Sequence, residues 1–117
     1  MNVKDFNVFI TVAETKHLTK ASKLLYMTPQ GISKVIKNLE NECDCELFLR
    51  TGNGMELSEA GRHFLEYAKK AIFYAIDNNY QGFTDGSKLY YREKPTQKSL
   101  YEKCVENGLK FLEDTDD

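Results

Sequence analysis

The sequence predicts a mainly α-helical fold with one small β-hairpin, and three observations support this fold class. Apolar residues recur every three or four positions along most of residues 1–76, which is the spacing of amphipathic helices. The run Gly52-Asn53-Gly54 is a turn signal between two short apolar runs, as in a β-hairpin. A chain of 117 residues buries one modest core, so we expect one domain with an appended tail.

The amino-acid composition is that of a soluble protein rather than a membrane protein. With 41% hydrophobic and 29% charged residues, the chain has the balance of a soluble globular protein, and no apolar run approaches the length of a membrane span. The N-terminus has no signal-peptide pattern, so we expect a cytoplasmic protein with Cys43, Cys45 and Cys104 as reduced thiols. The lone Cys43-x-Cys45 pair has no histidines at zinc-site spacing, so neither a metal nor another cofactor is predicted.

Two helices are expected before residue 26. The first covers residues 3–14, where Phe6, Phe9 and Ile10 lie on one apolar face. The second is short, with Thr19 as a candidate N-cap and a buried stripe that includes Leu24.

A third helix begins with Thr28 as its N-cap and Pro29 in the first helical position. Its spacing predicts an inner face of Ile32, Val35, Ile36 and Leu39. The outer face then carries Gln30, Ser33, Lys34 and Lys37. Two short helices separated by a tight turn are typical of a helix-turn-helix unit, whose second helix enters a DNA major groove.

The distribution of charge supports this interpretation. The net charge is −2 and the isoelectric point about 5.7, which argues against a protein that simply coats nucleic acid. From Thr15 to Leu39, however, there are five lysines and no acidic residue. A segment whose charged residues are all positive, in a protein that is acidic overall, indicates a surface that faces phosphates.

A hairpin and a fourth helix follow. Apolar runs on either side of Gly52-Asn53-Gly54 predict two strands, and the tip between them carries Arg50, Thr51 and Asn53. A hairpin beside a recognition helix is a wing, so the architecture is a winged helix-turn-helix. Ser58 caps a long fourth helix, which we expect to take part in dimerisation and which the resemblance described below implies to be a linker helix. The residues expected to meet a partner on it are Phe64, Leu65, Ala68, Ala71, Ile72 and Ala75.

Residues 77–117 form an acidic tail, with six basic and nine acidic residues, against a net charge of +1 for residues 1–76. The run Leu89-Tyr90-Tyr91 indicates a short strand. Ser99-x-x-Glu102 resembles a capping box that opens a short C-terminal helix. The apolar stripe expected on that helix consists of Tyr101, Cys104, Val105, Leu109 and Leu112. This stripe buries either against the winged domain of the same chain or against the fourth helix of a partner, and we expect a homodimer.

The stretch Phe9 to Gly61 closely resembles the N-terminal DNA-binding domain of LysR-type transcriptional regulators. The matching features are the aromatic-rich first helix, the Leu-Thr-x-Ala-Ser-x-x-Leu motif from Leu18 and Ser33 in the recognition helix. Leu39-Glu40, Leu47-Phe48-x-Arg50 and Leu57-Ser58-Glu59-Ala60-Gly61 complete the match. Two features depart from the family: Thr28-Pro29-Gln30-Gly31 stands where Ser-Gln-Pro-Ala is usual, and only residues 77–117 follow the linker helix, where the family has a two-lobed effector-binding domain.

The resemblance implies a bacterial transcription regulator that binds double-stranded DNA as a dimer through residues 1–76 and reads an inverted-repeat operator. The residues expected to contact DNA are Thr19, Lys20, Thr28, Pro29, Gln30, Ser33, Lys34, Lys37, Arg50, Thr51 and Asn53. A small-molecule effector is not expected without the effector domain, and no motif of an enzyme is present in the sequence. The alternative is an interaction module without DNA binding, which pairs through its linker helix with another regulator.

Overall fold

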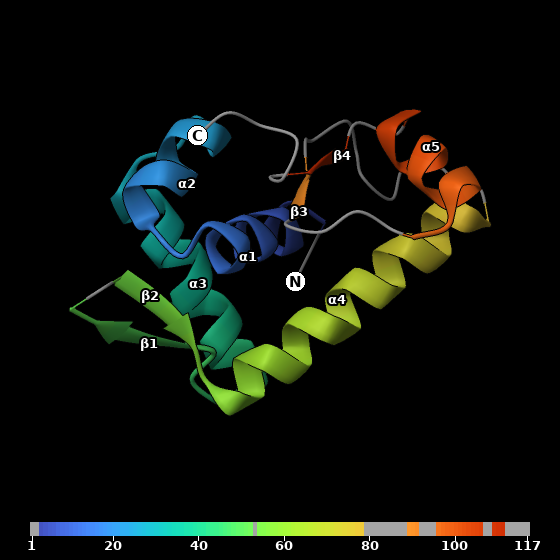
Figure 1. Ribbon diagram of the computed structural model, residues 1–117. Coiled ribbons are helices and arrows are strands. Elements are labelled where there is room, and N and C mark those ends of the chain that lie inside the picture. The colour runs from blue at the N-terminus through green and yellow to red at the C-terminus, as the bar shows by residue number, and fades with distance from the viewer. Residues whose placement is uncertain (1–2, 53, 79–88, 92–95, 107–108, 112–117) are drawn as a thin grey trace.

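The computed structural model contains five helices and two small sheets in its described residues (Figure 1). The structure describes residues 3–52, 54–78, 89–91, 96–106 and 109–111. Within these ranges no helix combines the length and the hydropathy needed to cross a bilayer.

The first three helices form the helix-turn-helix unit: α1 (Val3–Thr15), α2 (Leu18–Leu25) and α3 (Pro29–Cys43). The predicted start of α3 is confirmed, because the Thr28 hydroxyl oxygen accepts a hydrogen bond of 3.0 Å from the Gly31 N–H. The predicted cap of α2 is wrong. His17 occupies the N-cap position with extended backbone, and its carbonyl accepts the Ala21 N–H, so the helix begins one residue before Thr19.

The turn between α2 and α3 is closed by local hydrogen bonds. Tyr26 ends α2 in the left-handed region at φ 53°. The Met27 N–H donates to the Ser22 carbonyl at 3.1 Å, and the Ser22 hydroxyl donates to the Met27 carbonyl. These bonds satisfy backbone groups at the end of α2 and set the direction in which α3 leaves.

The predicted hairpin is confirmed as β1 (Phe48–Thr51) and β2 (Gly54–Leu57), an antiparallel pair in which Arg50 lies opposite Met55. It is anchored to the helical unit at its start and near its tip. The Glu40 carboxylate accepts the Leu47 and Phe48 N–H groups at 2.9 and 3.3 Å, and the Met55 N–H donates to the Lys16 carbonyl at 3.1 Å. The wing is therefore held to the last turns of α3 and to the loop between α1 and α2.

The long helix α4 (Glu59–Asp77) leaves directly from β2. The predicted cap is confirmed, because the Ser58 hydroxyl oxygen accepts the Gly61 N–H at 2.9 Å. Gly61 makes a close backbone approach, since a Cβ at this position would lie 2.0 Å from the Leu47 carbonyl oxygen. Only glycine fits at this junction between wing and linker helix.

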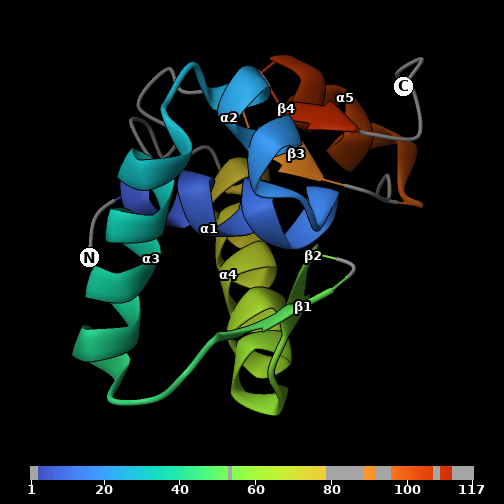
Figure 2. The same cartoon turned by 90° about the vertical axis from the view of Figure 1, so that its left-hand side faces the viewer.

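The core surrounds α1, which lies between α3 and α4 (Figure 2). Phe9 is fully buried, with its ring centroid 5.2 Å from that of Phe48 and 4.8 Å from that of Phe64. Phe6 stacks on Phe64 at 5.7 Å. On the same helix, Glu14 forms an ion pair with Lys69 of α4. Helix α1 thus connects the recognition unit to the linker helix.

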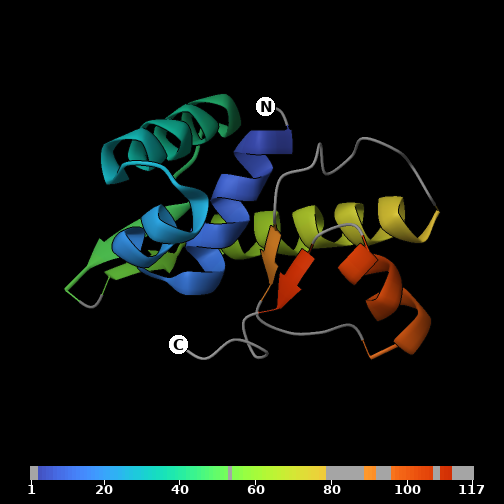
Figure 3. The same ribbon diagram turned by 90° about the horizontal axis from the view of Figure 1, so that it is seen from above.

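The tail consists of β3 (Leu89–Tyr91), α5 (Lys98–Glu106) and β4 (Leu109–Phe111), with β3 and β4 paired in parallel. Strand β3 lies beside α1, and α5 lies beside the C-terminal part of α4 (Figure 3). Of the predicted apolar stripe, Cys104 is fully buried within the same chain, whereas Val105 is 49% exposed.

The predicted strand at Leu89–Tyr91 is confirmed, whereas the predicted length of the tail helix is wrong. Helix α5 ends at Glu106, and Leu109 begins a strand. Asn107-Gly108 is a dipeptide typical of turns. The apolar residues keep their helical spacing on both sides of it, and this spacing led to the prediction of a longer helix. Ser99 is the second residue of α5 rather than its cap, and Leu112 lies outside the described residues.

Candidate nucleic-acid interface

One face of helix α3 packs on the core, and the opposite face is exposed at the surface. Ile32, Ile36 and Leu39 are buried, at 0%, 4% and 1% exposure. Gln30, Lys34 and Lys37 are exposed, and Ser33 is half-buried between the two faces. No ion pair in the described part of the chain involves Lys34 or Lys37. The helix therefore presents a polar, positively charged ridge on a rigid support.

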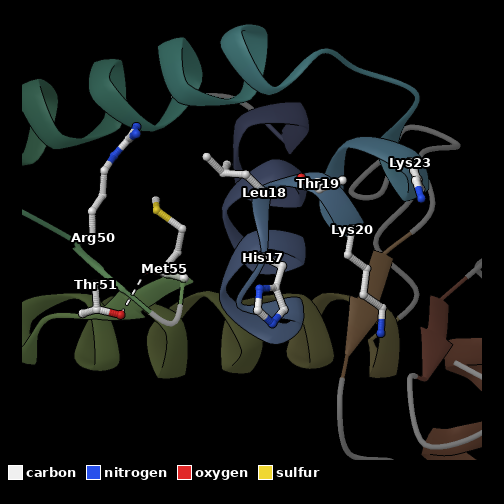
Figure 4. Close-up of a pocket in the computed structure, with 9 residues that line it drawn as sticks. His17, Leu18, Thr19, Lys20, Lys23, Arg50, Thr51 and Met55 are labelled. Atoms are coloured by element: carbon white, nitrogen blue, oxygen red, sulfur yellow. Dashed lines mark hydrogen bonds between the residues drawn. The ribbon is translucent and has the colours of Figure 1, made fainter.

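Arg50 of the wing joins this ridge. Its guanidinium Nη2 donates a hydrogen bond of 3.2 Å to the Ser33 hydroxyl oxygen. The side chain of Arg50 is thus directed towards α3 (Figure 4). A neutral hydroxyl partner leaves the positive charge of Arg50 uncompensated, so the group can still attract a phosphate.

A surface hollow of about 750 Å³ separates the start of α2 from the wing (Figure 4). Arg50 and Thr51 line it on the wing side, and Leu18 and Met55 contribute apolar side chains. On the α2 side it is lined by His17, Thr19, Lys20 and Lys23. Lysines and hydroxyl groups from two elements thus surround one depression at the surface, which suits contacts to a phosphate backbone.

The N-terminus of α3 adds a further polar group. Thr28 and Pro29 are both exposed. The Thr28 oxygen is used to cap the helix, and its O–H remains available as a donor. Because unpaired N–H groups and the helix dipole make a helix N-terminus favourable for anions, a phosphate close to Thr28 would be stabilised.

The two acids that flank the acid-free window each bind another group of the fold, and Glu40 also lines a small hollow with Ser33, Lys37 and Arg50. Glu14 is 4% exposed and pairs with Lys69, while the Glu40 carboxylate binds the backbone of the wing. Both carboxylates serve the fold, so the basic window keeps its sign at the surface.

Sequence reasoning missed two residues of this surface. His17 and Lys23 line the hollow with the wing, but neither was among the expected DNA contacts. The lysine was visible in the acid-free window. The histidine became apparent only when α2 was found to begin two residues earlier than predicted, with His17 and not Thr19 as its N-cap. Asn53, which was expected at the tip of the wing, lies outside the described residues.

Cys45 lines a surface hollow next to Lys37 and Arg50, whereas Cys104 lies in the tail helix α5. Burial, followed by the neighbouring Cys45 and Glu42 charges, raises the pKa of the Cys43 thiol. Burial and then the charge of Asp77 raise the pKa of Cys104 to about 11. Among the described residues, no three histidine, cysteine or acidic side chains are grouped as metal ligands would be.

The residues of α4 that were expected to form a dimer interface differ in burial. Ala68 and Ile72 are each 1% exposed, because α1 and α5 pack against that side of the helix. Phe64, Leu65 and Ala71 are half-buried, and the side chain of Ala75 lies outside the described residues. The large apolar groups of α4 that remain at the surface are Tyr67 and Tyr74, at 67% and 61% exposure.

Comparison with known proteins supports this arrangement. Residues 3–62 match the family model described as the bacterial regulatory helix-turn-helix protein, lysR family. The chain is 39% identical over 72 residues to the HTH-type transcriptional regulator YxjO of Bacillus subtilis, covering 62% of this chain and 25% of that protein. It is also 39% identical over 72 residues to the regulator BudR of Klebsiella aerogenes, covering 62% and 50%. The match thus spans between a quarter and a half of these relatives.

Solved structures give the same result. The DNA-binding domain of CbnR in complex with DNA is 30% identical, with a TM-score of 0.62, and the match covers 68% of this chain and 91% of that one. The DNA-binding domain of BenM in complex with benA site 1 DNA is 28% identical, with a TM-score of 0.61, covering 67% and 90%. The chain is a winged helix-turn-helix protein that belongs to the LysR family of bacterial regulatory proteins.

Proposed function

We propose that this chain is a DNA-binding transcriptional regulator that reads its operator with α3. The observation that carries the proposal is the polar ridge of Gln30, Ser33, Lys34 and Lys37, which stands on a buried apolar face and is joined by Arg50 from the wing. The CbnR and BenM domains, whose complexes with DNA are solved, share this fold at 28–30% identity, which supports the same use of the surface.

In this proposal α3 lies in the major groove. Gln30 is suited to a bidentate contact with adenine, and Ser33 to a base edge or a phosphate. Lys34 and Lys37 neutralise phosphates along the groove. Thr19, Lys20, Thr28 and the wing residues Arg50 and Thr51 set the register on the DNA backbone, and Asn53 is proposed to act with them.

We also propose a homodimer formed through α4, so that two recognition helices read an inverted repeat. Because α1 and α5 already cover Ala68 and Ile72, the contact surface would centre on Tyr67 and Tyr74, flanked by the half-buried Leu65 and Ala71. Exposed tyrosines on one helix face are typical interface residues, since their rings bury a large area at low entropic cost.

The test is a selection from a random duplex library with the 117-residue chain. The wild-type protein should enrich an inverted repeat, and the Ser33→Ala, Lys34→Ala double variant should not. Lys98→Ala, an exposed lysine at the start of α5, is the matched control for loss of a charge and should enrich the same sequence. A folded protein that enriches no sequence would contradict the proposal.

Salt dependence separates DNA contact from the second candidate, an interaction module that binds another regulator through α4. Exposure of Tyr67 and Tyr74 is the observation that favours this candidate. DNA binding should weaken steeply between low and moderate salt, with a smaller slope in Lys37→Ala. Binding through tyrosines should change little with salt and should be lost in Tyr67→Ala, Tyr74→Ala.

A further inference from the structure

A second hollow lies outside the residues assigned to DNA. It has a volume of about 360 Å³ and is formed between the first turns of α1 and the turn that joins α2 to α3. The residues that line it are Lys4, Asn7, Val8, Leu24, Leu25, Tyr26 and Met27. Small-molecule pockets in proteins have volumes from about 300 Å³ upwards, so this hollow has room for a small ligand.

Asn7 is the unusual residue in this lining. It is 2% exposed, and neither its Nδ2 nor its Oδ1 has a hydrogen-bond partner among the described residues. Its backbone carbonyl is occupied by the Thr11 hydroxyl at 2.7 Å, but the side-chain amide is not. A buried amide without partners is destabilising, and it has no hydrogen bond to break when it turns towards a ligand.

The other groups define the chemistry of that ligand. Lys4 is exposed and lies one helical turn before Asn7 and Val8, so its ammonium group and the Asn7 amide share one face of α1. Both stand near the N-terminus of α1, where the helix dipole favours negative charge. The remaining wall is apolar, with Val8 buried and Leu24, Leu25 and Met27 half-buried.

We propose that this hollow binds a small carboxylic acid with an apolar body. The carboxylate would accept hydrogen bonds from the Lys4 ammonium and the Asn7 Nδ2, and the hydrocarbon part would pack on Leu24 and Met27. The ligand would thereby join α1 to the turn that orients α3. This site lies in the DNA-binding part of the chain and differs from the expectation that no small-molecule effector binds without a separate domain.

The test uses the full 117-residue chain without DNA, so its result is independent of operator binding. Hexanoate is titrated into the ¹⁵N-labelled protein, with hexanamide and hexylamine as probes of equal length. Saturable shifts are expected at residues 4–8 and 24–27. Hexanoate should bind about tenfold more tightly than hexanamide, because the amide lacks the charge that pairs with Lys4, and hexylamine should not saturate.

Three variants assign the binding to this site. Asn7→Leu should weaken hexanoate binding at least tenfold and raise the thermal midpoint, because the unpartnered amide is replaced by an apolar group. Lys4→Gln should weaken hexanoate binding several-fold without changing hexanamide binding. Thr11→Val, one turn further along the same buried face, is the matched control and should bind as the wild type does.

Equal affinity for all three probes, or shifts that do not saturate, would overturn the proposal. Hexanoate binding that persists unchanged in Asn7→Leu would overturn it too and would leave an internal water as the partner of Asn7. If Asn7→Leu does not fold, Lys4→Gln decides, since an exposed lysine tolerates substitution. Unchanged hexanoate affinity in that variant contradicts the site.

Discussion

The winged domain and the tail differ in how each element is stabilised. Helices α1, α3 and α4 have 13, 15 and 19 residues, and α3 and α4 are capped by their own threonine and serine side chains. Helix α5 has nine residues, and β3 and β4 have three each. A two-stranded sheet and a short helix are marginal by themselves, so the tail depends on burial against α1 and α4.

Charge separates the two regions as well. Residues 1–76 carry a net charge of +1, with five of their eight lysines between Thr15 and Leu39, whereas the tail carries nine acidic and six basic residues. Of the described tail elements, β3 lies beside α1 and α5 lies beside α4 (Figure 3). The excess of positive charge therefore lies in the sequence of the winged domain, and the excess of negative charge lies in the sequence of the tail.

The largest expected effect is at the junction of wing and linker helix. Gly61→Ala would bring a Cβ to within 2.0 Å of the Leu47 carbonyl oxygen, so the backbone must shift. We expect loss of more than about 3 kcal/mol of stability, or no folding, by thermal and urea unfolding. Gly52→Ala is the matched control, because its Cβ would meet nothing within 4 Å. Equal stability of the two variants would contradict the geometry of this junction.

The second largest effect is expected for a substitution in the core of the winged domain, compared with one in the tail. Leu39→Ala removes a side chain that is 1% exposed from the winged domain and should cost about 2–5 kcal/mol in urea unfolding. Val105→Ala on α5 removes one that is 49% exposed and should cost less than about 0.5 kcal/mol. A larger cost at Val105 would mean that the tail is covered more fully than this structure shows.

Two ion pairs allow a finer comparison. Lys69→Met leaves the Glu14 carboxylate, 4% exposed, without its ammonium partner and should cost about 1–3 kcal/mol. Lys103 pairs with the exposed Asp77 at 3.5 Å, and Lys103→Met should cost about 0–1 kcal/mol. Both are measured by urea unfolding at low and high salt, and only the Asp77 pair should be sensitive to salt. A larger loss of stability in Lys103→Met than in Lys69→Met would contradict the difference in burial between the two ion pairs.

The smallest effect concerns pH and the tail. The pKa of Cys104 is raised from 9.0 to about 11, so the folded state holds the thiol proton more tightly than the unfolded state does. Its contribution to stability is complete below pH 9 and is lost as pH rises towards about 11. Cys104→Ala should therefore flatten the decline of stability in this interval, whereas the exposed Cys45→Ala should not. Parallel pH curves for wild type and Cys104→Ala would contradict this assignment.

Local signals in the sequence predicted most of the winged domain correctly. Thr28 and Ser58 cap their helices through bonds that depend only on residues three positions away, and the Gly-rich turn marks the hairpin. The prediction failed at Thr19, where the N-cap falls at His17, and at Leu109, which lies in a strand. At α2, His17 takes the N-cap position through its extended backbone and without a side-chain bond, so no cap signal in the sequence marks it. At Leu109 the helical spacing of apolar residues continues past the end of α5, because strands and helices can bury the same residues.

The candidate site was predictable only in part. The outward face of α3 follows from helical spacing, since Ile32 and Ile36 must point to the core. The bond from Arg50 to Ser33 was not predictable, because it joins residues 17 positions apart in different elements. The hydrogen bond from the Leu47 N–H to the Glu40 carboxylate was not predictable for the same reason, because it also joins two different parts of the fold.

By itself, the sequence determined the order of helices and hairpin, the acid-free window and membership of a regulator family, because each depends on neighbouring residues or on short motifs. Only the tertiary structure decided that Ala68 and Ile72 are covered within the chain and that the tail strands pair in parallel beside α1. It also decided that the side-chain amide of Asn7 is buried without a hydrogen-bond partner among the described residues. These features arise from contacts between segments distant in sequence, and which distant segments meet is decided by how the whole chain packs.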